Sequence, residues 1–330
     1  MVEKIAFFTG ENLQHIPYLY SVAKHHEGNV WLTNSKNTRN VLNNDYNIKP
    51  FIYNDSHNFI KHLDDNKIKK IVYADFYNFN SPNVKTVQLF HGGVGDRYNP
   101  ITLQTSDYDL LLRYGKRCED KFRIAGHNLD KVKLVGYSRL DDYYNNNIKK
   151  LKLFNNDRKT ILFAPTVFKD LKFNKWLNNV LNLVQDYNIV FKVHYLNSGI
   201  ANQVDIFMKN NNVSEDNYLI TTDYDILPYM EYCDMLISNN SGCIYEFLHF
   251  NKPIVIVNTH DLICRDNVMS LTYAWNYLPV ANNAKELYNF VKSELLKDGY
   301  KDRRKELLDY SFSFKDGRCG LRAMKLILEK

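Results

Sequence analysis

Polar residues that can do chemistry follow apolar runs at four places in this sequence. The first run ends at Phe90 and continues as His91-Gly92-Gly93-Val94-Gly95-Asp96-Arg97. Glycine lets the backbone approach a ligand closely and adopt positive φ, and a histidine at such an edge can act as a general base near neutral pH. We therefore expect His91 to act in catalysis; the alternative is a loop histidine beside turn glycines.

A second histidine closes another apolar run, Asn188–Tyr195. The alternation of a strand places Val190, Lys192 and His194 on one face, with His194 at the carboxyl end. A single histidine at a strand end is more often structural than catalytic. The presence of His91 in the other half of the chain favours a catalytic role, and both interpretations of His194 stay open.

The third place is a strand, a turn of small residues and the start of a helix. Met235–Ser238 has the pattern of the strand, Asn239-Asn240-Ser241-Gly242 that of the turn, and Ile244–Leu248 has helical spacing. Backbone N–H groups at a helix start and the helix dipole both favour phosphate, so we expect an anion site here. Ser241 also fits an ordinary N-cap. Glu246 can reach a ribose hydroxyl or merely complement the helix dipole.

The fourth place, Phe163–Asp170, is another strand followed by a polar turn. Thr166 and Lys169 lie in that turn, where they can meet a phosphate or a base. In open α/β sheets, ligands bind beyond the carboxyl ends of the strands, and all four places have this position.

We expect no metal site. Two Asp-x-Asp triplets occur, at 107–109 and 223–225, but Asp109 enters a strand and Asp225 has the position of an N-cap before a helix that contains Leu227. The 5 cysteines are odd in number and lack C-x-x-C spacing. This pattern favours reduced thiols over a disulfide framework or a zinc site.

The elements that must position these residues are strands alternating with helices. Their apolar runs lie at Ile5–Phe8, Val30–Leu32, Phe51–Tyr53, Ile71–Tyr73, Val84–Phe90, Leu110–Leu112, Val132–Val135, Thr160–Ala164, Ile189–Val193, Met235–Ser238 and Pro253–Val257. The runs lack strict alternation, as expected when helices cover both faces of a sheet. The pattern therefore predicts an α/β fold with parallel sheets.

A chain of 330 residues suits two such domains. The polar segment Tyr143–Arg158 follows a complete α/β set, so we expect one domain over residues 1–150 and a second over 151–330. The last segment, Lys301–Lys330, is largely helical by its pattern. Its apolar positions at three- and four-residue spacing predict that it packs back on the first domain.

The charge balance excludes some partners and leaves others open. The net charge is +6, with Lys and Arg scattered rather than gathered in a stripe, so we expect no nucleic-acid partner. A mild positive excess suits an anionic substrate or an anionic membrane surface, and equally a solvated surface without a partner. We see neither a signal peptide nor an apolar run of about 20 residues, and expect a cytoplasmic protein whose membrane contact, if any, is peripheral.

In this order, the four places resemble the CDP-glycerol glycerophosphotransferase family, the enzymes of teichoic-acid-type polymers. The resemblance covers roughly Val84 to the C-terminus. The elements that match family motifs are His91-Gly92, Gly136-Tyr137-Ser138-Arg139-Leu140-Asp141, Ala164-Pro165-Thr166, Lys192-Val193-His194-Tyr195, Leu236–Gly242 through Lys252-Pro253, and Asp316-Gly317.

The resemblance implies a GT-B fold, in which two Rossmann-like domains flank a cleft, with the acceptor on the N-terminal side and the nucleotide donor on the C-terminal side. It also implies a CDP-alditol donor, no metal or other cofactor, a lipid-linked or polymer acceptor, and a peripheral place on the inner face of the membrane. By the same resemblance His91 and His194 are catalytic. The implied donor-binding residues are Gly92, Arg139, Thr166, Lys169, Lys192, Asn239, Asn240, Ser241, Gly242 and Glu246.

The chain departs from the family pattern mainly around the implied donor site. Asn239 stands where the family has Asp, Gly242 where it has Ser, and Glu246 where an Asp is usual. Two other functions therefore stay open. One is a GT-B glycosyltransferase or sugar-nucleotide epimerase that uses a UDP-sugar, which Glu246 after a Ser-Gly turn favours. The other is a family member that binds nucleotide or polymer without turnover.

Overall fold

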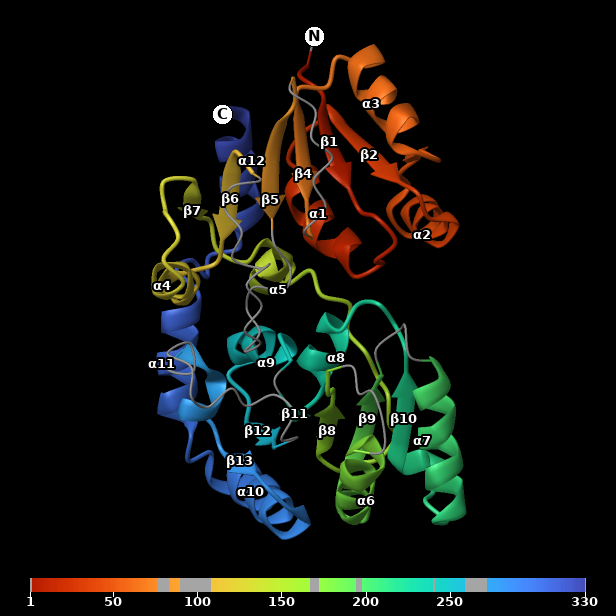
Figure 1. The fold of residues 1–330 in the computed structure, drawn as a ribbon. Coiled ribbons are helices and arrows are strands. Elements are labelled where there is room, and N and C mark those ends of the chain that lie inside the picture. The colour runs from red at the N-terminus through yellow and green to blue at the C-terminus, as the bar shows by residue number, and fades with distance from the viewer. Residues whose placement is uncertain are drawn as a thin grey trace. The chain divides into compact units, whose positions relative to one another are not determined.

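The computed structural model describes residues 2–75, 83–89, 108–166, 172–193, 198–239, 241–258 and 272–329. The chain divides into two compact units, each built around its own parallel sheet (Figure 1). Unit 1 comprises residues 1–94, 99–147 and 310–330, and unit 2 comprises residues 95–98 and 148–309. The C-terminal segment thus belongs to unit 1, although it follows unit 2 in the sequence.

The described part of unit 1 holds a seven-stranded parallel sheet in the order β3-β2-β1-β4-β5-β6-β7. Its strands are β1 (Ile5–Phe8), β2 (Asn29–Thr33), β3 (Phe51–Ile52), β4 (Lys70–Tyr73), β5 (Lys85–Leu89), β6 (Leu110–Arg113) and β7 (Val132–Leu134). Its helices are α1 (His15–Ala23), α2 (Lys36–Tyr46), α3 (Ser56–Asp65), α4 (Lys116–Ile124), α5 (Asp141–Tyr144) and α12 (Cys319–Glu329).

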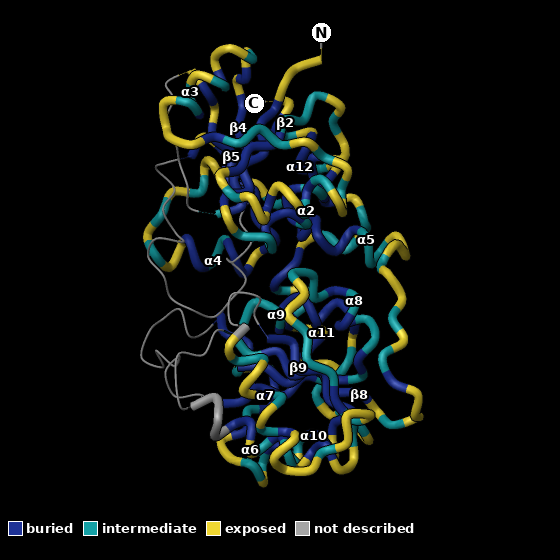
Figure 2. The backbone as a smooth tube through the Cα atoms, turned by 90° about the vertical axis from the view of Figure 1, so that its right-hand side faces the viewer, coloured by how far each residue is buried: buried dark blue, intermediate teal, exposed yellow. Residues whose placement is uncertain are grey.

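Both faces of this sheet are covered, which explains why its strands are apolar throughout rather than alternating. Ile5 and Phe7 face a core to which α1 and α12 contribute. Phe8 faces the other way, against Phe59 of α3 and the neighbouring Tyr73. Figure 2 draws buried stretches of the backbone, such as β1, in dark blue.

The described part of unit 2 holds a six-stranded parallel sheet in the order β10-β9-β8-β11-β12-β13. Its strands are β8 (Thr160–Phe163), β9 (Asn188–Lys192), β10 (Tyr218–Thr221), β11 (Met235–Ser238), β12 (Ile254–Val257) and β13 (Val280–Ala281). Its helices are α6 (Lys172–Val184), α7 (Ser198–Asn210), α8 (Leu227–Tyr232), α9 (Cys243–Phe247) and α10 (Ala284–Lys297), and α11 (Lys301–Ser311) carries the chain back to unit 1. Side chains of α6, α7 and α10 form one core with the sheet.

The predicted α/β class and its parallel sheets are confirmed. Two strands were not predicted: β13 has only two residues, and β10 is an edge strand whose last three residues are only partly buried. The predicted C-terminal helical segment is two helices, α11 and α12, separated by a bend at Asp316-Gly317 where Gly317 has φ 69°. Leu321 and Leu328 of α12 remain exposed, so the buried face is narrower than predicted.

The C-terminal helix is fastened to unit 1 through its first turn, as the sequence predicted for this end of the chain. The Asp141 carboxylate accepts hydrogen bonds from the backbone N–H groups of Cys319 (3.0 Å) and Gly320 (2.7 Å). These N–H groups lack partners inside a helix, so an acceptor from another element is needed. Asp141 belongs to the Gly-Tyr-Ser-Arg-Leu-Asp motif, which therefore holds α12 in place.

No helix within the described ranges is both long enough and apolar enough to span a bilayer.

Candidate functional site

The best-placed site in unit 2 lies where its strand order reverses. From β8 the chain proceeds to β9 and β10 on one side, whereas β11 leads to β12 and β13 on the other. Between the carboxyl ends of β8 and β11 the connections leave in opposite directions, and ligands of open α/β sheets bind at such a point. The predicted turns after Phe163 and Ser238 both begin here.

Three hydrogen bonds join the residues after β8 to those at the end of β11. The backbone N–H of Thr166 donates to Oδ1 of Asn239 (2.8 Å). The Ser238 hydroxyl donates to the Ala164 carbonyl (2.6 Å), and the Cys243 thiol reaches the same carbonyl (3.3 Å). The bonded residues are 73, 74 and 79 positions apart in the sequence. The three bonds therefore join the segment after β8 to the end of β11 and the segment after it, at the carboxyl edge of the sheet.

Charged residues surround the Cys243 thiol at this edge. Burial raises the pKa of Cys243 to about 11; hydrogen bonds from Ser238 and Ser241 oppose the shift, Glu246 adds to it and Lys192 lowers it. The thiol is therefore protonated at neutral pH and is a poor nucleophile. Because Lys192 and Glu246 both act on this thiol, the two side chains lie close to the same edge.

The turn after β11 leads into a helix that is too short to have a large dipole. Helix α9 has five residues, and its N-cap is Gly242 rather than Ser241. Ser241 still serves the first turn, since its hydroxyl and its carbonyl accept from the N–H groups of Cys243 (3.4 Å) and Ile244 (3.2 Å). Anion binding here must therefore rest on the turn and its neighbouring side chains more than on the helix dipole.

A side chain at Gly242 would meet no atom of the described residues. The φ of Gly242, −58°, is one that any residue adopts, so the backbone does not require glycine here. A Cβ at this position would meet no described atom within 4 Å. The absent side chain therefore leaves room beside Ser241 and the end of β11.

The structure brings together Thr166, Lys192, Asn239, Ser241, Gly242 and Glu246 at this edge of unit 2. Arg139 lies in unit 1, where its guanidinium stacks 4.9 Å from the Tyr18 ring centroid and donates to the Tyr18 hydroxyl (3.2 Å). The remaining predicted residues, His91, Gly92, Lys169, His194 and Asn240, lie outside the described residues.

Comparison with known proteins identifies the family. The family model described as CDP-Glycerol:Poly(glycerophosphate) glycerophosphotransferase matches residues 80–329. The chain belongs to this family. The match includes the carboxyl edge of β8, β9 and β11 and the C-terminal helix α12.

A curated relative and several solved structures are similar to this family member. Teichoic acid glycerol-phosphate primase of Bacillus subtilis (strain 168) is 29% identical over 167 residues, which are 48% of this chain and 41% of the primase. The match thus spans less than half of that relative's length.

The solved structures share the fold at low identity. The Wall Teichoic Acid Polymerase TagF soaked with CDPG has a TM-score of 0.68 and 18% identity, with 99% of this chain and 88% of that chain covered. The S. aureus MnaA-UDP co-structure has a TM-score of 0.68 and 14% identity, with 98% and 96% covered. These likenesses show the GT-B fold that the sequence predicted.

Unit 1 of this glycerophosphotransferase-family chain has a reversal point of its own, between β1 and β4. His15 lies there, 1% exposed, with Nε2 3.6 Å from Oδ2 of Asp75 and Nδ1 3.3 Å from the Thr9 carbonyl. The sequence patterns did not predict this pair, because nothing in the spacing of His15 and Asp75 indicates that β1 and β4 are neighbours. The pair also precedes the segment that the family model matches.

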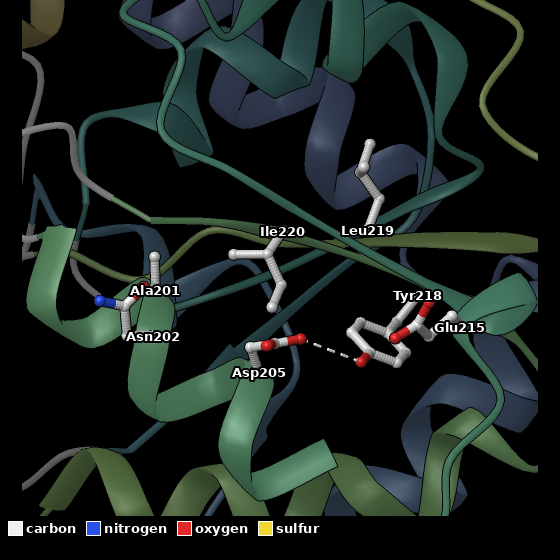
Figure 3. Close-up of a pocket in the computed structure, with 7 residues that line it drawn as sticks. All are labelled: Ala201, Asn202, Asp205, Glu215, Tyr218, Leu219 and Ile220. Carbon is white, nitrogen blue, oxygen red and sulfur yellow. Dashed lines mark hydrogen bonds between the residues drawn. The ribbon is translucent and has the colours of Figure 1, made fainter. Parts of the chain in front are cut away.

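A separate hollow of about 420 Å³ lies along the edge strand β10 and helix α7 (Figure 3). It is lined by Ala201, Asn202, Asp205, Glu215, Tyr218, Leu219 and Ile220. Two of its polar groups bind each other, since the Tyr218 hydroxyl donates to Asp205 (3.2 Å), and Asp205 also pairs with Lys209, which is not part of the lining (2.8 Å). Strand β9 and strand β8 separate β10 from the β11 edge, so this hollow is not part of the candidate site.

The last aspartate of each Asp-x-Asp triplet has partners within the fold. Asp109 accepts from the backbone N–H and the hydroxyl of Thr86 (2.8 and 3.0 Å), and Asp225 accepts from the N–H of Leu227 (3.0 Å). Within the described ranges, no group of three or more His, Cys, Asp or Glu side chains is arranged to hold a metal ion.

Proposed function

We propose that this chain transfers an alditol phosphate, such as glycerol phosphate, from a CDP-activated donor to a hydroxyl acceptor during synthesis of a cell-surface polymer. The observation that carries the proposal is the bond between Thr166 and Asn239. It joins two separate motifs of the glycerophosphotransferase family at the reversal point of unit 2, where open α/β sheets bind their ligands. The relatives named as a glycerol-phosphate primase and a teichoic acid polymerase support the same chemistry.

In the proposed reaction, an acceptor hydroxyl attacks the phosphorus that bears the alditol. The new oxygen–phosphorus bond forms as the bond to the nucleotide phosphate breaks, and CMP leaves. His91 takes the proton of the attacking hydroxyl. His194, Lys192 and the turn at Ser241 stabilise the charge that develops on the phosphates. Positioning and charge stabilisation suffice for phosphoryl-type transfer.

The proposal includes the partners and place that the resemblance implies. The acceptor is a lipid-linked or polymer hydroxyl, and unit 1 is its side of the protein. The net charge of +6 suits peripheral contact with an anionic membrane on its cytoplasmic face.

A ligand panel tests the donor. A ligand that binds only the folded state raises the melting temperature. CDP-glycerol or CDP-ribitol should raise it more than UDP or UDP-sugars at equal concentration, and CMP should raise it less than the full donor. A larger shift with a UDP-sugar than with either CDP-alditol would overturn the proposed donor.

A UDP-sugar enzyme is the second candidate, because two observations favour it. Glu246 is buried in α9 directly after the Ser241-Gly242 turn. The fold also matches a putative UDP-N-acetylglucosamine 2-epimerase from Listeria monocytogenes, with a TM-score of 0.68, 13% identity, and 99% and 96% of the two chains covered. In this case UDP would be released or retained in place of CMP.

Replacing Gly242 with valine should weaken nucleotide binding without unfolding the protein. The backbone angles accept valine, and its Cβ meets no described atom within 4 Å, so the side chain would fill the space proposed for the diphosphate. We expect the Kd for CDP, measured by calorimetry, to rise by about tenfold or more, because the valine methyl groups would occupy the place proposed for the phosphates. Unchanged affinity in a folded Gly242→Val variant would place the diphosphate elsewhere.

Transfer activity should survive removal of divalent metal. One aspartate of each triplet is used within the fold: Asp109 binds Thr86 and Asp225 binds the N–H of Leu227. We therefore expect equal rates of nucleotide release with and without EDTA after dialysis against the chelator. Loss of activity that magnesium or manganese restores would return the Asp-x-Asp segments to consideration as metal ligands.

A further inference from the structure

Asn239 has a side chain whose two polar atoms are used differently. The residue directly follows β11 and is 2% exposed. The atom that faces the Thr166 N–H at 2.8 Å must be an acceptor, which identifies it as the carboxamide oxygen Oδ1. The amide nitrogen Nδ2, with its two N–H groups, is therefore turned away from Thr166.

Nδ2 of Asn239 is buried and has no hydrogen-bond partner in the part of the chain that the structure describes. Its near neighbours direct their hydrogens elsewhere: the Ser238 hydroxyl and the Cys243 thiol both reach the Ala164 carbonyl. Buried donors in native proteins are nearly always paired with protein, water or ligand. An unpaired donor at a ligand-binding edge therefore indicates a ligand that supplies an acceptor.

The surroundings favour an anionic acceptor. Lys192 ends β9, which pairs with β8 on the side away from β11, and its ammonium donates to the Val193 carbonyl just beyond the carboxyl end of β9 (3.2 Å), so a cation lies at the carboxyl ends of the strands of this sheet. Beside the turn, a Cβ on Gly242 would meet no described atom within 4 Å. A buried donor and a cation at the carboxyl end of the same sheet suit a phosphate oxygen, because hydrogen bonds to an ionised acceptor are the stronger kind.

We propose that Nδ2 of Asn239 donates a hydrogen bond to a phosphate oxygen of the nucleotide diphosphate; this rests on the proposed function. The family pattern has Asp at this position. An aspartate would keep the bond to the Thr166 N–H with one oxygen, but its second oxygen would present negative charge where Nδ2 presents a donor. Compared with an aspartate at this position, Asn239 gives the diphosphate one more hydrogen-bond donor and removes one negative charge.

The test compares Asn239→Asp with a matched control, Asn188→Asp. The first substitution keeps the shape of the side chain and the bond to Thr166, and replaces the donor Nδ2 by a negatively charged oxygen. Asn188 is equally buried at the opposite end of the sheet, where its Nδ2 donates to Asn156 (2.7 Å). It controls for the loss of stability that a buried carboxylate causes. Affinities for CDP, UDP and cytidine are measured by calorimetry, with folding checked by circular dichroism.

We expect Asn239→Asp to weaken binding of the preferred diphosphate by about 10–100-fold, the effect of losing a hydrogen bond to a charged group. Cytidine, which has no phosphate, should bind both proteins equally, and Asn188→Asp should leave all affinities unchanged. Equal or tighter diphosphate binding by a folded Asn239→Asp protein would overturn the inference while leaving the proposed function standing. If the wild type binds UDP more tightly than CDP, the proposed CDP donor is wrong. The loss of diphosphate affinity in Asn239→Asp would then be measured with UDP, and it would still test the inference. If the wild type binds neither diphosphate, both proposals fail.

Discussion

Replacing His91 by alanine should lower turnover by about 10²–10⁴-fold, the usual contribution of a general base. Nucleotide affinity should change little, because the proposed role of His91 is to take the proton of the acceptor hydroxyl, whereas Lys192, His194 and the turn at Ser241 are proposed to hold the phosphates. Turnover is measured as nucleotide release with saturating donor, and affinity by calorimetry on the same preparation. His194→Ala should lower both quantities, since His194 follows Lys192 and Val193 in the sequence and is proposed to stabilise charge on the donor phosphates.

His57→Ala is the matched control for this experiment. His57 is an exposed histidine of α3 in the same unit, and its loss should leave turnover and affinity unchanged. Normal turnover by a folded His91→Ala protein would place the base elsewhere, and the proposed mechanism would then be wrong even though the fold is right.

Replacing Gly320 by alanine should destabilise unit 1. A Cβ on Gly320 would lie 2.0 Å from the Ser21 carbonyl oxygen, in the backbone of α1. Helix α12 would have to move away from α1 and strain its bonds to Asp141. We expect a loss of about 3 kcal/mol in the free energy of unfolding, the upper range for overpacking, and a melting temperature lower by about 6–12 °C.

Gly199→Ala is the control, because both glycines are the second residue of a helix. A Cβ on Gly199 of α7 would meet no described atom within 4 Å. Alanine is about 1 kcal/mol better than glycine inside a helix, so this variant should be as stable as the wild type or slightly more stable. Equal melting temperatures for the two variants would show that α12 does not pack on α1 as described.

The fold followed from the sequence because its strands are short, apolar and separated by helical segments. Runs such as Ile5–Phe8 and Met235–Ser238 became β1 and β11 with the bounds that the pattern predicted. Strand β10 was not predicted because it lies at the edge of its sheet, where its residues are only partly buried and do not form a continuous apolar run. The C-terminal segment was predicted as one amphipathic stretch, whereas Gly317 bends it in the left-handed region.

The candidate site was predicted in its residues and not in its contacts. Strand–turn–helix signals located Asn239 and Thr166 separately, because each follows an apolar run. That they bond to each other depends on β8 and β11 being neighbours, which is a property of the strand order. The His15–Asp75 pair was missed for the same reason. The short α9 could not be foreseen either, because the apolar spacing after Gly242 continues through Leu248, where the α-helix gives way to a 3-10 turn.

Product analysis tests the central claim most directly. The purified chain is incubated with CDP-glycerol and an acceptor that ends in a glycerol hydroxyl. The nucleotides are then separated by chromatography, and the mass of the acceptor is measured by mass spectrometry. The proposed function predicts release of CMP together with an acceptor heavier by glycerol phosphate, with one CMP for each unit added and both products strongly reduced in His91→Ala. The account would be contradicted if CDP-glycerol remained intact while a UDP-sugar was converted or cleaved under the same conditions.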